Sequence, residues 1–168
     1  MIRNAANADI IILTLGLIEA WYHILSGLYA NSINPILLAR YRDQFQLHLL
    51  DVKETLECLK DILKLLKKVH KNGNFHLIIT VSSVPLSATF TKSDIIIANQ
   101  ASKSILRAAA NEFINNHENV DYFTCFEIVN NSSKEMAWRP DKIHINPSMV
   151  AHIVKTFYEM YHQQCEAG

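Results

Sequence analysis

Apolar residues gather along this chain in short unbroken runs and in longer stretches with helical spacing. The unbroken runs occupy residues 9–16 (DIIILTLG), 75–83 (FHLIITVSS) and 120–129 (VDYFTCFEIV), and the third shows some alternation. Runs of this length, rich in β-branched residues and bounded by Gly or Ser, are typical of strands that a parallel sheet buries on both faces. We therefore predict three strands.

The first run has a second interpretation as the core of a targeting segment, because Arg3 precedes it. Asp9 lies directly in front of the run, and no A-x-A-like cleavage site follows it. The run is also much shorter than the roughly 20 apolar residues that a membrane-spanning helix needs. These features favour a strand, and we predict no membrane span.

Three stretches with apolar residues at helical spacing follow the strands, at residues 51–73, 93–117 and 146–164. In the first, Asp51 as N-cap with Glu54 three positions later predicts a capping box, and Gly73 predicts the helix end. Ser93 is the predicted N-cap of the second helix. Pro147 is the predicted first residue of the third.

The order of these elements predicts an α/β fold, a three-layer α/β/α sandwich around a mainly parallel sheet. Residues 28–50 contain scattered apolar positions, Pro35 and no clear period, so we interpret them as an insertion or a long active-site connection. No linker or repeat interrupts the sequence, which predicts one domain over residues 1–168.

Composition narrows the classes of function. Of the 168 residues, 49% are hydrophobic and 19% charged, as in globular proteins, and sixteen basic residues balance sixteen acidic ones. This balance gives no net attraction to nucleic acid, and the lysines of residues 51–73 are most simply a solvated helix face. The three cysteines are far apart, which predicts a reducing, cytoplasmic location, no disulfide framework and no zinc site.

In parallel α/β folds, ligands bind beyond the carboxyl ends of the strands. Residues 16–21, 82–91 and 130–146 should lie there. The last segment contains Asp141 and His144, and a carboxylate three residues before a histidine can accept the Nδ1 proton and leave Nε2 as a general base. The spacing alone is weakly specific, and it favours a turn aspartate beside a surface histidine over a catalytic pair.

Five segments in this order, ILTLGLIEAW, ITVSSVPLSATF, ANQASKSILRAA, YFTCFEIV and DKIHINP, resemble the GSCFA family, which is considered related to the SGNH serine esterases. The resemblance covers nearly the whole chain. It implies an SGNH- or flavodoxin-like fold, with Asp141 as the orienting acid and His144 as the catalytic base. It implies no cofactor and no metal.

The resemblance also assigns other positions. Gly16 to Glu19 lies where the superfamily has a Gly-x-Asn-Asp block that helps to stabilise an oxyanion, but Ile18 replaces the asparagine and has no side-chain donor. Glu19 is then expected to orient a loop or contact substrate, or else to be an exposed acid in a first helical turn. Further matching positions are Ser82, which is expected to face the site, and Asn99, Ser102, Lys103 and Arg107. These four fall on a predicted helix, where each is expected to contact substrate or else to pack or pair with the protein.

One segment that the resemblance implies has no counterpart in this sequence. The family carries a Gly-Ser-Cys-Phe-Ala segment with the nucleophilic serine upstream of the first strand seen here, and this chain has no Gly-Ser-Cys. We therefore expect the C-terminal two-thirds of a domain that is N-terminally incomplete. Its function would be that of a truncated serine hydrolase acting on small-molecule, glycan or lipid esters, or of a noncatalytic binding domain that retains the pocket.

Loss of a neighbouring strand would leave the edge of residues 10–15 open. This edge contains no charge and no proline, which predicts self-association through it. The alternative is that residues 28–50 fold over the gap.

Overall fold

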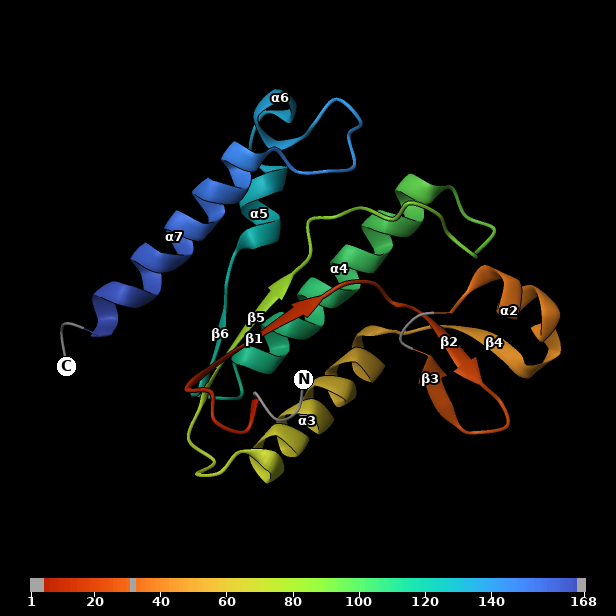
Figure 1. The fold of residues 1–168 in the computed structure, drawn as a ribbon, viewed down its shortest axis with the longest axis horizontal. Helices are drawn as coiled ribbons and strands as arrows, with labels where there is room; N and C mark the ends of the chain where they lie inside the picture. The colour runs from red at the N-terminus through yellow and green to blue at the C-terminus, as the bar shows by residue number, and fades with distance from the viewer. Residues whose placement is uncertain (1–4, 31–32, 166–168) are drawn as a thin grey trace.

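A parallel sheet of three strands forms the centre of the computed structural model, which describes residues 5–30 and 33–165 (Figure 1). The strands are β1 (Ile10–Leu15), β5 (His76–Val81) and β6 (Val120–Tyr122), in the order β1-β5-β6. β5 is central because it is apolar on both faces, with Leu77, Ile78 and Ile79 fully buried. The predicted α/β architecture with a parallel sheet between helices is confirmed.

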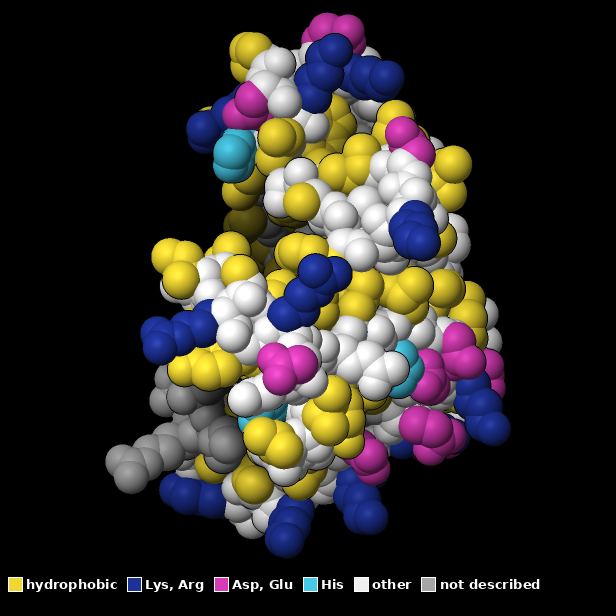
Figure 2. All heavy atoms as spheres, turned by 90° about the vertical axis from the view of Figure 1, so that its right-hand side faces the viewer, with side chains coloured by type: hydrophobic (Ala, Val, Ile, Leu, Met, Phe, Trp, Pro, Cys, Tyr) yellow, Lys and Arg dark blue, Asp and Glu magenta, His cyan; other side chains and the backbone are white. Residues whose placement is uncertain are grey.

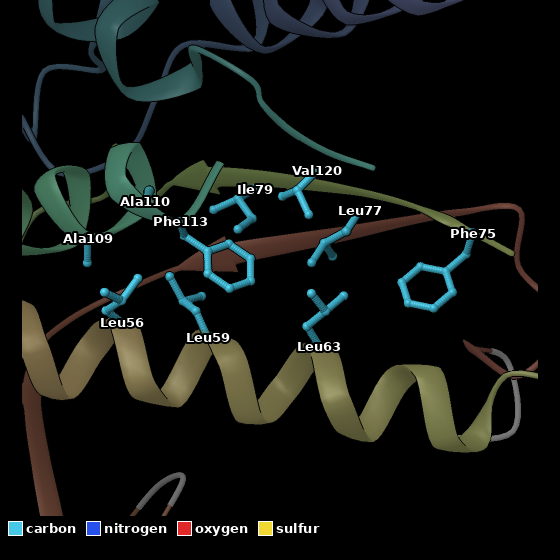
Figure 3. Close-up of a cluster of buried hydrophobic side chains, with 10 residues drawn as sticks. All are labelled: Leu56, Leu59, Leu63, Phe75, Leu77, Ile79, Ala109, Ala110, Phe113 and Val120. Carbon is cyan, nitrogen blue, oxygen red and sulfur yellow. The ribbon is translucent and has the colours of Figure 1, made fainter. Parts of the chain in front are cut away.

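Helices α3 (Val52–Val69) and α4 (Ile95–Ile114) cover one face of this sheet. Their apolar sides meet the sheet in a cluster of buried side chains (Figure 3). In that view Leu56, Leu59 and Leu63, one helical turn apart on α3, point toward the strands, and the fully buried Phe113 of α4 lies between them and β5. This cluster fixes the depth at which α4 lies below the sheet.

The opposite face is covered near β6 by α5 (Cys125–Asn130), α6 (Lys134–Ala137) and α7 (Pro147–Cys165). A second cluster joins these three helices through Val129, Ala137 and Met149. α7 reaches back along β6, where the Phe157 and Phe123 rings meet edge to face at 5.1 Å. Among the described helices, none combines the length and the apolar character that a membrane crossing demands.

β1 is not buried on both faces, so that prediction is wrong. Ile11, Leu13 and Leu15 pack against the core cluster, whereas Ile10 and Ile12, on the other face, are 48% and 53% exposed. The reason is that α7 lies beside β6 and leaves β1 uncovered. Among the described residues, β1 pairs only with β5, so its outer edge is open, and self-association through it stays a prediction.

Residues 28–50, predicted as an insertion or a long connection, belong to a second, antiparallel sheet. Its strands β2 (Glu19–His23), β3 (Leu28–Ala30) and β4 (Phe45–Leu49) have the order β3-β2-β4, and α2 (Pro35–Arg40) and a 3-10 turn (Arg42–Gln44) link β3 to β4. Because this segment pairs with β2, it does not close the open edge of β1. β2 and β3 show no apolar–polar alternation, and that of β4 (FQLHL) spans only five residues, which is why the pattern missed them.

Helix boundaries differ from the predictions in two places. The capping box of Asp51 and Glu54 is present, but α3 ends at Val69, since His70 is extended and packs on Phe75. Gly73, with a φ of 65°, turns the chain toward β5 instead. The N-cap of α4 is Asp94, whose carboxylate accepts from the backbone N–H of Ile96 at 2.8 Å. α7 begins at Pro147 as predicted.

The third run is a strand only over Val120–Tyr122, and its second half is the helix α5. Glu127 accepts hydrogen bonds from Tyr122 and Arg107, and Val129 is fully buried. These tertiary contacts require a helical turn after Thr124 and override the weak strand alternation.

Candidate functional site

The segment that joins α6 to α7 is a tight hairpin-like loop. Trp138 and Ile145 form an antiparallel bridge, and the N–H of Arg139 donates to the carbonyl of His144 at 2.8 Å. Asn146 closes the base, because its Nδ2 donates to the carbonyl oxygens of Glu135, Met136 and Trp138 at 2.9, 3.1 and 2.9 Å. These bonds hold the loop in one conformation without a ligand.

Asp141 and His144 form the predicted pair at the tip of this loop. Asp141 Oδ2 lies 2.8 Å from His144 Nδ1, and Oδ1 accepts from the backbone N–H groups of Ile143 and His144 at 2.9 Å each. The N–H groups of His144 and Ile143, together with the imidazole, hold the pKa of Asp141 well below its usual range. The hydrogen-bond distance predicted for this pair is confirmed.

This geometry determines which ring nitrogen of His144 carries the proton. An ionised carboxylate can only accept, so Nδ1 donates to Asp141 and the neutral imidazole has a bare Nε2. The His144 side chain is 68% exposed, and Nε2 makes no hydrogen bond with any described residue. The pair is therefore oriented as a general base requires and is accessible to a reactant from solution.

A cavity of about 980 Å³ lies between this loop, α6, α5, the start of α4 and the segment after β5. Lys142 and Asn146, on either side of His144 in the sequence, line it, as do Ser83 and Pro85. Asp141, His144 and residues 16–21 are not among its lining residues. Of the three segments expected beyond the carboxyl ends of the strands, residues 82–91 and 130–146 contribute side chains to this cavity and residues 16–21 do not.

The resemblance pointed to Ser82, but it is Ser83 that lines the cavity. The Ser82 hydroxyl accepts from the N–H of Val84 at 3.3 Å, while Ser83 is 6% exposed and donates to the carbonyl of Cys125 at 3.2 Å. Alternation of side chains beyond the end of β5 could have identified Ser83. Sequence reasoning also missed Trp138 and the cations of the loop, although the quoted segment DKIHINP contains one of them, Lys142.

The block from Gly16 to Ile18 is held by two buried neighbours on α4. Lys103 Nζ donates to the carbonyl of Gly16 at 2.9 Å, and Ser102 Oγ accepts from the N–H of Ile18 at 3.0 Å. Both side chains are 1% exposed, and burial lowers the pKa of Lys103 to about 8. Ser102 and Lys103 therefore hold the backbone, and the N–H of Ile18 is not free for an oxyanion.

Glu19 and Asn99 also hold loops. Glu19 begins β2 rather than a helix, and its carboxylate accepts from Thr89 Oγ1 at 2.5 Å and from the N–H of Phe90 at 2.9 Å. Asn99 Oδ1 accepts from the N–H of Leu86 at 3.0 Å, and Asn99 lines the cavity. The expectation that Glu19 orients a loop agrees with these contacts.

Arg107 ties α4 to α5. Its Nε donates to Glu127 at 2.8 Å, and its guanidinium lies 4.1 Å from the centre of the Tyr122 ring. The Tyr122 hydroxyl donates to both carboxylate oxygens of Glu127, and burial followed by the charge of Glu127 raises its pKa. This network fixes α5, which forms one wall of the cavity.

The GSCFA family model matches residues 1–157. The chain belongs to the GSCFA family. No curated protein and no solved structure matches it.

A metal ion would need several ligand side chains of this GSCFA chain to lie close together. Within residues 5–30 and 33–165, no three His, Cys, Asp or Glu side chains gather as a metal site would require. The side chains brought together around the cavity are instead amides, lysines, an arginine, a carboxylate and an indole.

Proposed function

We propose that this chain carries the acid–base part of a site for hydrolysis or transfer of an acyl ester. His144 acts as general base through Nε2, and Asp141 holds its imidazole in the required tautomer and orientation. The observation that carries the proposal is the pair of contacts at Asp141, one oxygen on Nδ1 at 2.8 Å and the other on two backbone N–H groups. The first contact orients the imidazole, and the second holds the carboxylate that orients it.

No sequence motif identifies a nucleophile in this chain, since its 168 residues contain no Gly-Ser-Cys. His144 can nonetheless deprotonate a water molecule or a hydroxyl that approaches Nε2 from the exposed side. We therefore expect slow hydrolysis of p-nitrophenyl acetate without a burst of acyl-enzyme.

The test compares three variants. His144→Ala should remove the site-dependent part of this hydrolysis, and Asp141→Asn should reduce it, since an amide fixes the tautomer less well. The control is His152→Ala, which removes an exposed histidine from α7. Equal rates for His144→Ala and His152→Ala would eliminate His144 as the base.

A second measurement addresses the nucleophile. A fluorophosphonate probe should label no serine stoichiometrically. Complete labelling of one serine would show that the chain holds its own nucleophile, and Ser82 and the cavity-lining Ser83 are the first to replace by alanine.

The alternative function is noncatalytic binding of a ligand in the cavity. The observation that favours it is that Asp141 and His144 do not line the cavity, whereas their neighbours do. Ligand binding that survives His144→Ala, together with a rate of ester hydrolysis that this variant leaves unchanged, would favour this alternative.

A further inference from the structure

The charges around the cavity are unevenly distributed. Three cations line it, Lys134, Arg139 and Lys142, against the single carboxylate of Glu135. The chain as a whole has no net charge, so this excess is local. Figure 2 shows Lys and Arg side chains, with Asp and Glu side chains among them, at the upper end of the molecule, where Figure 1 places α6 and the loop after it, above a hollow in the surface.

These cations are not used within the protein. Lys134, Arg139 and Lys142 make no ion pair and no side-chain hydrogen bond with any described residue, unlike Arg107, which is bound to Glu127. Asp141 is the acid nearest in sequence to Arg139 and Lys142, but its two oxygens accept from His144 and from backbone N–H groups. The lining of this cavity therefore carries two more positive than negative side chains, and no carboxylate in the described part of the chain pairs with the three cations.

The loop geometry fixes the backbone that carries Arg139 and Lys142. Lys142 has a φ of 58°, a conformation uncommon for a residue with a side chain, and its N–H donates to the carbonyl of Arg139 at 2.9 Å. The half-buried Trp138, which follows α6, adds a flat apolar surface to the same cavity. A ligand with an anionic group and an apolar or ring-shaped body matches both features.

We propose that the cavity binds an anionic ligand, a molecule with a carboxylate or phosphate group that pairs with Lys134, Arg139 and Lys142. The inference rests on the proposed function, because it names the substrate class of that site: an acyl ester that also carries a negative charge. The body of the ligand lies against Trp138, and the ester is directed toward the loop tip that carries His144.

The test uses three probes that share one sugar ring: glucose 6-phosphate, glucuronate and uncharged glucose. Binding is followed by the NMR signal of the Trp138 indole N–H, with the Trp21 indole as internal reference. Glucose 6-phosphate or glucuronate should shift the Trp138 signal saturably, and glucose should not. The better of the two charged probes distinguishes a phosphate from a carboxylate ligand.

Charge variants provide the second arm. The combined replacement of Lys134, Arg139 and Lys142 by Gln should weaken anion binding about tenfold, as expected for three partly exposed charge contacts. Glu135→Gln should strengthen it, and the single variants Arg139→Gln and Lys142→Gln keep the test valid if the triple variant fails to fold. The matched control replaces three exposed lysines of α3, Lys64, Lys67 and Lys68.

Anion binding that is weakened by the cavity variants and not by the α3 variants supports the inference. Equal binding of glucose, equal affinity in the triple variant, or no saturable shift with any probe overturns it. The outcome is separable from that of the proposed function, because binding is measured without turnover. Anion binding with hydrolysis independent of His144 would contradict only the proposed function.

Discussion

Lys103 should make the stability of the protein depend on alkaline pH. Its ammonium is buried with one acceptor, the carbonyl of Gly16, and burial lowers its pKa from 10.5 to about 8. Between these two pH values the unfolded chain keeps the proton that the folded chain has released. The unfolded state then binds more protons, so the free energy of unfolding rises with pH across this window.

The magnitude follows from the shift. A lowering from 10.5 to about 8 corresponds to roughly 3 kcal/mol. In a chain of this size that is about 6–12 °C in Tm. Lys103→Met has no such proton, so the difference in unfolding free energy between wild type and variant should change by this amount between pH 7.5 and 10.5.

Urea unfolding followed by circular dichroism at the two pH values measures this difference. The comparison cancels the tyrosines, which titrate in both proteins. Lys64→Met, which removes an exposed lysine of α3, is the control for loss of a surface charge. A difference between wild type and Lys103→Met that stays constant from pH 7.5 to 10.5 would refute the reasoning. If the variant does not fold, titration of the wild-type Lys103 amine by NMR tests the same point.

Three other predictions concern the rest of the fold. Tyr122→Phe removes the hydroxyl that bonds to Glu127 and should lower the free energy of unfolding by about 1–3 kcal/mol, measured in urea; no change would mean that the network does not hold α5. Asp141→Asn should speed amide exchange at its two backbone donors. Because the folded pKa of Asp141 is lowered, their wild-type protection should persist above about pH 4 and fall only at lower pH. Ile12→Lys should reduce light scattering by the purified chain, and the control Leu65→Lys on α3 should not, if the open edge of β1 causes self-association.

The sequence pattern correctly predicted those elements that carry a strong local signal. The run of β5, the leucines of α3, the capping box at Asp51 and Pro147 at the start of α7 each correspond to what the structure shows. In these elements local propensity and tertiary packing favour the same conformation. Periodicity alone therefore located them to within a few residues.

The pattern failed where contacts distant in sequence decide the structure. α5 is a helix because Glu127 reaches Arg107 and Tyr122, twenty and five residues away. β2 is a strand because β4, more than twenty residues later, pairs with it. The exposure of Ile12 depends on where α7 lies. None of these facts is encoded in the few residues around each position.

In the candidate site, too, local contacts were predictable and contacts between distant residues were not. Asp141 and His144 were predictable because their interaction is local: three residues of loop bring a carboxylate onto Nδ1. The α4 positions were expected to contact substrate or else to pack or pair with the protein, and three of them pair with backbone groups: Ser102 with the N–H of Ile18, Lys103 with the carbonyl of Gly16, and Asn99 with the N–H of Leu86.

These contacts explain why one helix carries so many polar residues on its inner side. Each strand of a parallel sheet ends in a loop whose backbone groups have lost their ladder partners, and a buried unpaired group costs about 1–3 kcal/mol. α4 lies below the ends of β1 and β5 and supplies a side chain for these groups one after another along its length. A buried lysine is an unfavourable donor for this purpose, because burial destabilises its charged ammonium and so lowers its pKa. It is retained here in the position where its length reaches the Gly16 carbonyl while its stem is buried beside Ser102. Substitution of Ser102 should therefore alter the cavity through the loop that it holds and not through contact with a ligand, and the cavity-lining residues of α6 and of the loop after it are expected to distinguish one ligand from another.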